Sequence, residues 1–195
     1  YLIYKKIINL KLIESDYQFI LNYSSIVKEE DLILWWKCNE NNSKYLTDSS
    51  KYNHNNNKLI NNIYFVPGKF NNCIEMDRGY INYKFQTKQI YNKFTLSLWV
   101  KPKMNNYINN TSIFSSDFTN NLSYLNDKTF QISIYNNCWA IIDNLLHLTD
   151  IKINTNWTHI IYIFNKNNKN LLYININKEL EWIDNNYNNE FNYFN

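Results

Sequence analysis

The sequence predicts an all-β protein built as an antiparallel two-sheet β-sandwich. From Asp31 onward, short runs of β-branched and aromatic residues alternate with Asn-rich clusters that are typical of turns. No helical segment of ordinary length separates these runs, which disfavours a parallel α/β sheet. Hydrophobic residues make up 45% of the 195 residues, enough apolar material to offset the conformational entropy lost on folding.

The strand pattern differs along the chain. Residues 94–100 and 130–135 alternate apolar and polar side chains, the period of a strand with one buried face, whereas 160–164 is apolar on both faces and indicates a covered central strand. Asn136 and Asn137 predict a tight hairpin turn with positive φ, and a further hairpin end is expected at Asn177 and Lys178. The predicted strands are 32–38, 73–76, 80–83, 94–100, 112–115, 130–135, 138–142, 157–164 and 171–177.

The length predicts one domain with short appendages. We expect a lead-in segment over residues 1–30, the sandwich over 31–184, and an Asn-rich tail over 185–195. The tail takes the place of the last strands of the sandwich, which would then be truncated. The start at Tyr1 predicts a piece of a larger protein.

Charge and composition exclude several classes. The net charge of +3 comes from scattered basic residues, so a nucleic-acid partner is not expected. Uninterrupted apolar stretches are far shorter than the roughly 20 residues of a membrane span, so none is predicted. Cys38, Cys73 and Cys138 match no zinc or CxxC spacing, and their odd number permits at most one internal disulfide, whose pairing the sequence leaves open.

Six segments of the chain follow one another in an order and spacing known from other proteins. They are Leu32-Ile33-Leu34-Trp35-Trp36, Asp48-Ser49-Ser50 with Asn53-His54, Pro67 to Asp77, Phe94 to Pro102, Trp157-Thr158-His159-Ile160 and Leu172-Tyr173-Ile174-Asn175. In this order they resemble the laminin G-like, concanavalin A-like superfamily. That resemblance implies a jelly roll of two curved antiparallel sheets over residues 31 to about 180, a fold whose members include both lectins and glucanases. Asparagine supplies 39 residues, a bias typical of AT-rich genomes, so we expect an apicomplexan member.

The chain departs from the family at two places. Lys51 and Asn55 stand where the first loop of the family usually has Gly, and the closing strands of the family are not recognisable in residues 185–195. We infer truncation, or cover of the open sheet edge by residues 1–27 or by a partner.

Aromatic side chains are the strongest binding candidates. If Phe94, Leu96 and Leu98 face the core, then Trp99 points away from it, as Tyr135 and Tyr173 do on their strands. Together with Trp139, these rings are candidates for a ligand-binding platform on the concave face, because exposed aromatic patches usually mark an interface. The alternative is that Trp99 packs beneath a loop.

A calcium site is the one cofactor that the sequence suggests. Asp48 and Asn53 offer the oxygen ligands that Ca²⁺ prefers, and relatives often hold calcium in this loop. Capping of the loop by the Asp48 side chain explains the same residue equally well.

Catalysis is not expected. Glucanases of the superfamily carry Glu-x-Asp-x-x-Glu, but Tyr80 stands where the last Glu of that pattern would follow Glu75 and Asp77. Glu179 and Glu181 share a strand face without a third carboxylate, and the three histidines form no metal or triad spacing.

The sequence therefore predicts a non-catalytic recognition or adhesion module of a larger secreted or surface protein, which binds glycan or protein through the concave face and rim loops. The alternative is a structural module that packs against neighbouring domains or subunits of a larger assembly. A glycoside hydrolase is the weaker alternative.

Overall fold

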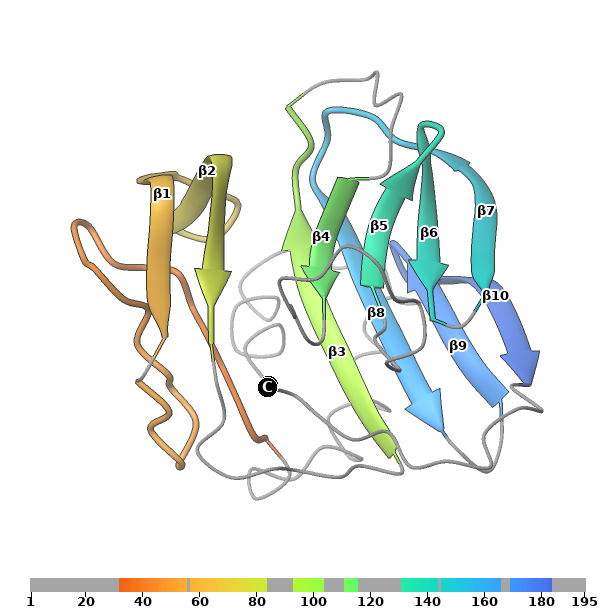
Figure 1. Cartoon of the computed structure of the whole chain (residues 1–195), viewed down its shortest axis with the longest axis horizontal. Helices are drawn as coiled ribbons and strands as arrows, with labels where there is room; N and C mark the ends of the chain where they lie inside the picture. The colour runs from red at the N-terminus through yellow and green to blue at the C-terminus, as the bar shows by residue number, and fades with distance from the viewer. Residues whose placement is uncertain are drawn as a thin grey trace, which may run out of the picture. The chain divides into compact units, whose positions relative to one another are not determined.

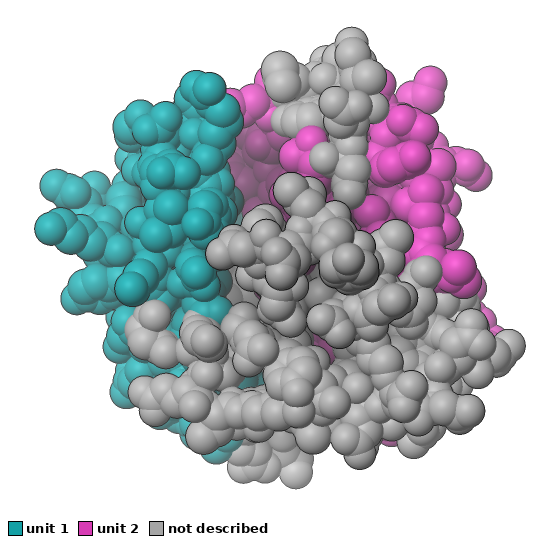
Figure 2. Space-filling view, in the orientation of Figure 1, with its two compact units in different colours: residues 1–84 teal, residues 85–195 magenta. Residues whose placement is uncertain are grey.

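The computed structural model describes residues 32–55, 57–83, 93–103, 111–115, 131–143, 145–165 and 169–183. The predicted segments 1–30 and 185–195 lie outside these residues, and the predicted domain boundaries stay predictions. By contacts the chain divides into two compact units, residues 1–84 and 85–195 (Figure 2). Each is described separately below.

The first unit contains one antiparallel strand pair, β1 (Lys58–Pro67) and β2 (Asn72–Asn82). The register shifts between Ile60 and Asn62, where Asn61 adopts a positive φ of 63°. Gly79 lies opposite this irregularity in the strand register. The two strands approach closely there, since a Cβ added at Gly79 would come within 2.9 Å of the Ile60 carbonyl oxygen. A side chain at this position would therefore push the two strands apart.

The second unit contains two four-stranded antiparallel sheets. One has the order β10-β9-β8-β3 and the other the order β4-β5-β6-β7, and Figure 1 shows them as two layers. The strands are β3 (Lys93–Val100), β4 (Thr111–Ser115), β5 (Gln131–Tyr135), β6 (Cys138–Ile142), β7 (Leu146–Lys152), β8 (Thr158–Asn165), β9 (Lys169–Ile174) and β10 (Asn177–Ile183).

The core lies between these two sheets. The β4-β5-β6-β7 sheet contributes Ile132, Ile134, Trp139 and Ile141, and the facing sheet contributes the next group of side chains. The latter are Ile160, Tyr162, Phe164, Leu172 and Ile174, all at most 2% exposed. The described strands pair antiparallel, and those of the second unit pack as a sandwich, which confirms the predicted fold class.

Most predicted strands are confirmed to within one or two residues. The run 160–164 lies in β8, between β3 and β9, and its residues Ile160 to Tyr162 are buried on both faces as expected. Asn136 and Asn137 adopt positive φ values of 48° and 64° in the β5–β6 turn, which confirms that hairpin.

Four predictions about strands were wrong. Residues 32–38 form only an isolated bridge between Trp36 and Asp48, because the Asp48 side chain binds the Trp35 amide in place of a strand partner. The predicted strands 73–76 and 80–83 are one strand, β2. The predicted strands do not include β1 and β7, whose polar residues hide their period, and they do not include β10, although Glu179 and Glu181 were expected to share a strand face. The turn after β9 lies at Asn175 and Ile176, two residues before the predicted position.

No helix among the described residues is both long and apolar enough to cross a membrane.

Candidate functional site

The Trp99 face is the side of the β10-β9-β8-β3 sheet that points away from the core, and we define it by Ser97, Trp99, His159, Ile161 and Tyr173, of which His159 and Ile161 are buried. The strand register produces it. Phe94, Leu96 and Leu98 pack against the core, so the intervening residues Ser97 and Trp99 point outward. Trp99 lies opposite His159, and Ser97, Ile161 and Tyr173 lie in one row across three strands.

The Trp99 side chain is held by a stack on His159. The two ring centroids are 4.6 Å apart and the planes are inclined by only 9°, so the imidazole covers one face of the indole. Stacked aromatic pairs of this kind contribute about 0.5–1.5 kcal/mol beyond the area that they bury. The indole is half-buried, whereas His159 is buried. The stack therefore restricts the rotamer of Trp99.

His159 is in turn fixed by its hydrogen bonds. The Ser97 hydroxyl lies 2.9 Å from His159 Nε2, and the His159 backbone N–H donates to Asn175 Oδ1 at 3.0 Å. The Asn175 N–H donates back to the His159 carbonyl oxygen at 2.9 Å, which attaches the β9–β10 turn to β8. These contacts make His159 a hydrogen-bonded structural residue of β8.

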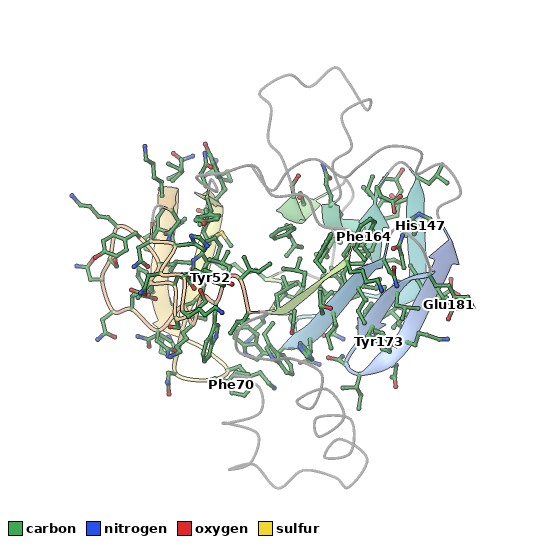
Figure 3. All side chains as sticks on the ribbon, turned by 90° about the horizontal axis from the view of Figure 1, so that it is seen from below. Tyr52, Phe70, His147, Phe164, Tyr173 and Glu181 are labelled. Atoms are coloured by element: carbon green, nitrogen blue, oxygen red, sulfur yellow. The ribbon has the colours of Figure 1, made fainter. Side chains whose placement is uncertain are left out.

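Tyr173 extends the Trp99 face toward β10. It points away from the core, on the side of the sheet opposite to Phe164 (Figure 3). Its partner in the β9–β10 register is Lys178, and Ile161 separates it from Ser97. Tyr173 is half-buried, so part of its surface is accessible to solvent.

A charged cluster adjoins Tyr173 on β9 and β10. The Glu181 carboxylate binds the ammonium groups of both Lys169 and Lys178. Hydrogen bonds from Lys169 and then Lys178 lower the pKa of Glu181 to about 2, and the same carboxylate raises the pKa of Lys178. Near neutral pH these three groups therefore carry one net positive charge.

The structure does not unite the four predicted aromatic residues. Trp99 and Tyr173 share the Trp99 face, but Tyr135 lies on β5 in the other sheet. Its side chain points to the same side of β5 as Ser133, away from the core residues Ile132 and Ile134. Two sheets therefore separate Tyr135 from Trp99. No single platform can use both rings.

Trp139 requires a correction as a binding candidate. Its side chain is only 2% exposed and belongs to the core between the two sheets. A strand such as β6 that is apolar on both faces gives no period from which the direction of its tryptophan can be deduced.

Asp48 lies in a dense set of hydrogen bonds. Its Oδ1 accepts from the backbone N–H groups of Trp35 (2.9 Å) and Ser50 (2.8 Å). Its Oδ2 accepts from the Ser50 hydroxyl (2.7 Å) and from the His54 N–H (2.8 Å). Burial raises the pKa of Asp48, but the bonds from Ser50, His54 and Trp35 outweigh it and the net pKa is lowered.

This geometry bears on the calcium prediction. A cation at Asp48 would have to displace N–H and O–H donors that already point at both oxygens. Asn53 is exposed, and the described part of the chain contains no group of three His, Cys, Asp or Glu side chains suited to a metal ion. Calcium at Asp48 and Asn53 stays a prediction, whereas the loop-capping role of Asp48 is visible in its contacts.

The sequence missed His159, Ser97 and Asn175 as parts of the site. The phase of β8 could have revealed His159, because it alternates with the core residue Ile160 and must point to the side of Trp99. The bond between the Asn175 side chain and β8 depends on the turn and could not be deduced.

Comparison with solved structures identifies proteins of similar fold. The binding domain of botulinum neurotoxin DC in complex with rat synaptotagmin II is 17% identical, with a TM-score of 0.57 over 82% of this chain and 41% of that one. The same binding domain in complex with SialylT gives 17% identity and a TM-score of 0.57 over 84% and 42%. The botulinum neurotoxin serotype D ligand binding domain in complex with N-acetylneuraminic acid gives 19%, 0.54, 84% and 41%.

These neighbours are binding domains with a β-sandwich fold. The chain spans about two-fifths of their length. No known family profile matches the chain, and no curated protein sequence matches it.

Proposed function

We propose that the chain is a non-catalytic recognition module of a larger secreted or surface protein, and that it binds an acidic glycan through the Trp99 face. The observation that carries this proposal is the Trp99 ring, half-buried and stacked on the buried His159, on the same side of the sheet as Tyr173. The neighbours in complex with SialylT and N-acetylneuraminic acid support a glycan as the ligand class. A laminin G-like, concanavalin A-like ancestry and an apicomplexan origin belong to this proposal.

The chemistry of the Trp99 face suits a sugar. A pyranose ring presents an apolar C–H face that packs on an aromatic ring, and its hydroxyls need polar partners at the edges. Ser97 is exposed beside Trp99, and Lys178 lies opposite Tyr173 in the strand register. The net positive charge of Lys169, Glu181 and Lys178 favours a sugar that carries a carboxylate, and salt would weaken that attraction.

Trp99→Ala is the variant that tests the proposal. We expect it to lower affinity for a sialylated glycan at least tenfold, about 1.4 kcal/mol, because it removes the stacking surface and leaves the charged cluster intact. Tyr135→Ala, on the other sheet, is the matched control and should bind as the wild type does. Glycan-array binding with calcium present, followed by titration calorimetry on variants that retain the wild-type circular dichroism spectrum, measures both. Equal affinity for Trp99→Ala and wild type would contradict the proposal.

The second candidate is a structural module that packs against other domains or subunits. It is favoured by three exposed leucines at the outer edge of the β4-β5-β6-β7 sheet: Leu145 (62% exposed), Leu146 and Leu148. Apolar side chains gathered on an edge strand suit a protein partner. Wild-type binding by Trp99→Ala together with loss of a protein partner in Leu148→Lys would favour this candidate.

Hydrolysis is the weaker candidate. A glycosidase needs a general acid whose pKa is raised toward neutrality, whereas the two lysines lower the pKa of Glu181 to about 2. Tyr80 is exposed at the position of the missing third carboxylate.

A further inference from the structure

Two of the three cysteines lie in the same part of the first unit. Cys38 follows the Trp36–Asp48 bridge by two residues, and Cys73 is the second residue of β2. The Asn72 side chain joins the two segments, because its Nδ2 donates to the Glu40 carbonyl oxygen at 3.2 Å and to Asn41 Oδ1 at 2.6 Å. The segment that begins at Cys38 is therefore bound to the start of β2.

Each of these cysteines is also held locally. The Cys73 Cβ lies directly over Gly68, where an added Cβ would come within 2.7 Å of it. Its Sγ lies 3.9 Å from the Pro67 carbonyl oxygen. The Cys38 Sγ lies 3.9 Å from the Trp36 carbonyl oxygen, and Cys38 itself adopts a positive φ of 56°. Both side chains are half-buried.

The pKa of Cys38 agrees with the proximity of the two segments that Asn72 joins. Burial, then the negative charge of Glu40, then Cys73 raise the pKa of the Cys38 thiol to about 12. A charge on Cys73 contributes to this shift because charge interactions fall off with distance and the Asn72 side chain holds the two segments together. Cys138 lies on β6 in the second unit.

We propose that Cys38 and Cys73 form a disulfide bond in an oxidising compartment, and that Cys138 remains a thiol. The bond would close a loop over residues 39–72, which contains Asp48 and all of β1. It would stabilise the first unit mainly by restricting its unfolded state, with a larger effect for a long loop than for a short one. It would also be the single internal disulfide that three cysteines allow, whose pairing the sequence leaves open.

The oxidant that we propose is a disulfide such as glutathione disulfide. The Cys73 thiolate attacks one sulfur of glutathione disulfide and releases one glutathione thiolate. Cys38, once deprotonated, attacks the Cys73 sulfur of the mixed disulfide and releases the second glutathione. The two protons pass to the two glutathiones, so two cysteine thiols are oxidised and one disulfide is reduced. Because burial and Glu40 still raise the pKa of the Cys38 thiol after Cys73 has reacted, the second step should accelerate as the pH rises above neutral.

Peptide mapping of the 195-residue chain tests the proposal. The reduced protein is equilibrated with glutathione disulfide and glutathione, alkylated, and digested with trypsin without reduction. Cleavage after Lys37, Lys44, Lys69 and Arg78 separates the two cysteines into peptides 38–44 and 70–78. We expect these two peptides to be joined, and peptide 129–152, which contains Cys138, to carry the alkyl group.

Two variants control for the identity of the pair. Cys138→Ser should retain the 38–73 link, and addition of a reductant should lower the melting temperature of its first unit on the order of 10 °C, as in the wild type. Cys73→Ser should show no link and no response to reductant. Three alkylated cysteines after oxidation, or a link that includes Cys138, would overturn the proposal, and neither result depends on glycan binding.

Discussion

Trp139→Ala should destabilise the second unit by about 3–5 kcal/mol. The indole is 2% exposed and lies among Ile134, Ile141 and the residues of the facing sheet, so its removal leaves a cavity between two sheets that cannot easily collapse. Urea denaturation, followed by circular dichroism and by hydrogen exchange at β5 and β8, measures the loss.

Trp99→Ala is the matched tryptophan variant for this experiment. The Trp99 ring is half-buried and lies outside the core between the sheets, so its removal mainly loses the stack on His159, and we expect a cost of about 1 kcal/mol. Leu145→Ala, at a side chain that is 62% exposed, should cost less than about 0.5 kcal/mol. If Trp139→Ala cost no more than Leu145→Ala, Trp139 would not be a core residue and would return as a candidate for the binding site.

Asp48→Asn should destabilise the loop before β1 by about 2–3 kcal/mol. Both Asp48 oxygens accept from N–H or O–H donors, and an asparagine would place its own NH₂ group against donors such as the His54 N–H. The Asp48 Oδ2 acceptor is then lost, and the NH₂ group of the asparagine faces the His54 N–H, so that two donors point at each other. Hydrogen exchange of the Trp35 and His54 amides in the first unit reports the opening of this loop.

The same carboxylate predicts a pH dependence. The folded-state pKa of Asp48 is lowered below the ordinary value of 3.8, so its contribution to stability is complete well above that value. It is lost as the pH falls below 3.8 and through the lowered folded-state pKa. The difference in stability between wild type and Asp48→Asn should therefore shrink as the solution is acidified below about pH 4.

Asp150→Asn is the control for charge. Asp150 is exposed on β7, and its removal should leave the Trp35 and His54 amides as protected as in the wild type at every pH. A constant difference between wild type and Asp48→Asn from neutral to acid pH would mean that the charge of Asp48 does not hold the loop.

The alternation of apolar and polar residues along a strand predicts which side chains point toward the core. It does not predict to which of the two sheets the strand belongs. Phe94 to Val100 predicted that Trp99 points away from the core, and the structure agrees. The same reasoning applied to Tyr135 gave a correct outward direction, but β5 belongs to the opposite sheet, so the ring lies on the other side of the sandwich. Sheet membership depends on pairings between residues distant in sequence, which a local pattern does not contain.

Strands without a clear two-residue period gave the other errors. In β6 both phases are apolar, so Trp139 could not be assigned to the core from the sequence. In β1 and β10 the apolar residues are interrupted by asparagine, lysine and glutamate, and both strands contain a register shift that breaks the period. Asparagine-rich segments therefore look like loops even where backbone pairing makes them strands.

The Asp48 loop illustrates a different limit. The sequence offered calcium coordination or loop capping for the same residue. Four contacts from Trp35, Ser50 and His54 favour capping, and they depend on backbone positions up to 13 residues apart. When a side chain such as that of Asp48 binds a backbone amide in place of a neighbouring strand, the sequence shows no alternation of apolar and polar residues that would predict the contact.

The location of glycan binding tests the central claim most directly. Chemical shifts of the tryptophan indole and histidine ring nuclei in the isotope-labelled chain can be followed as a sialylated oligosaccharide is added. We predict saturable changes at Trp99 and His159 and none at Trp139, with weaker changes for the desialylated sugar because the Lys169–Glu181–Lys178 cluster then lacks its anionic partner. Changes confined to the β4-β5-β6-β7 sheet, or no change at any residue at millimolar sugar, would contradict the account.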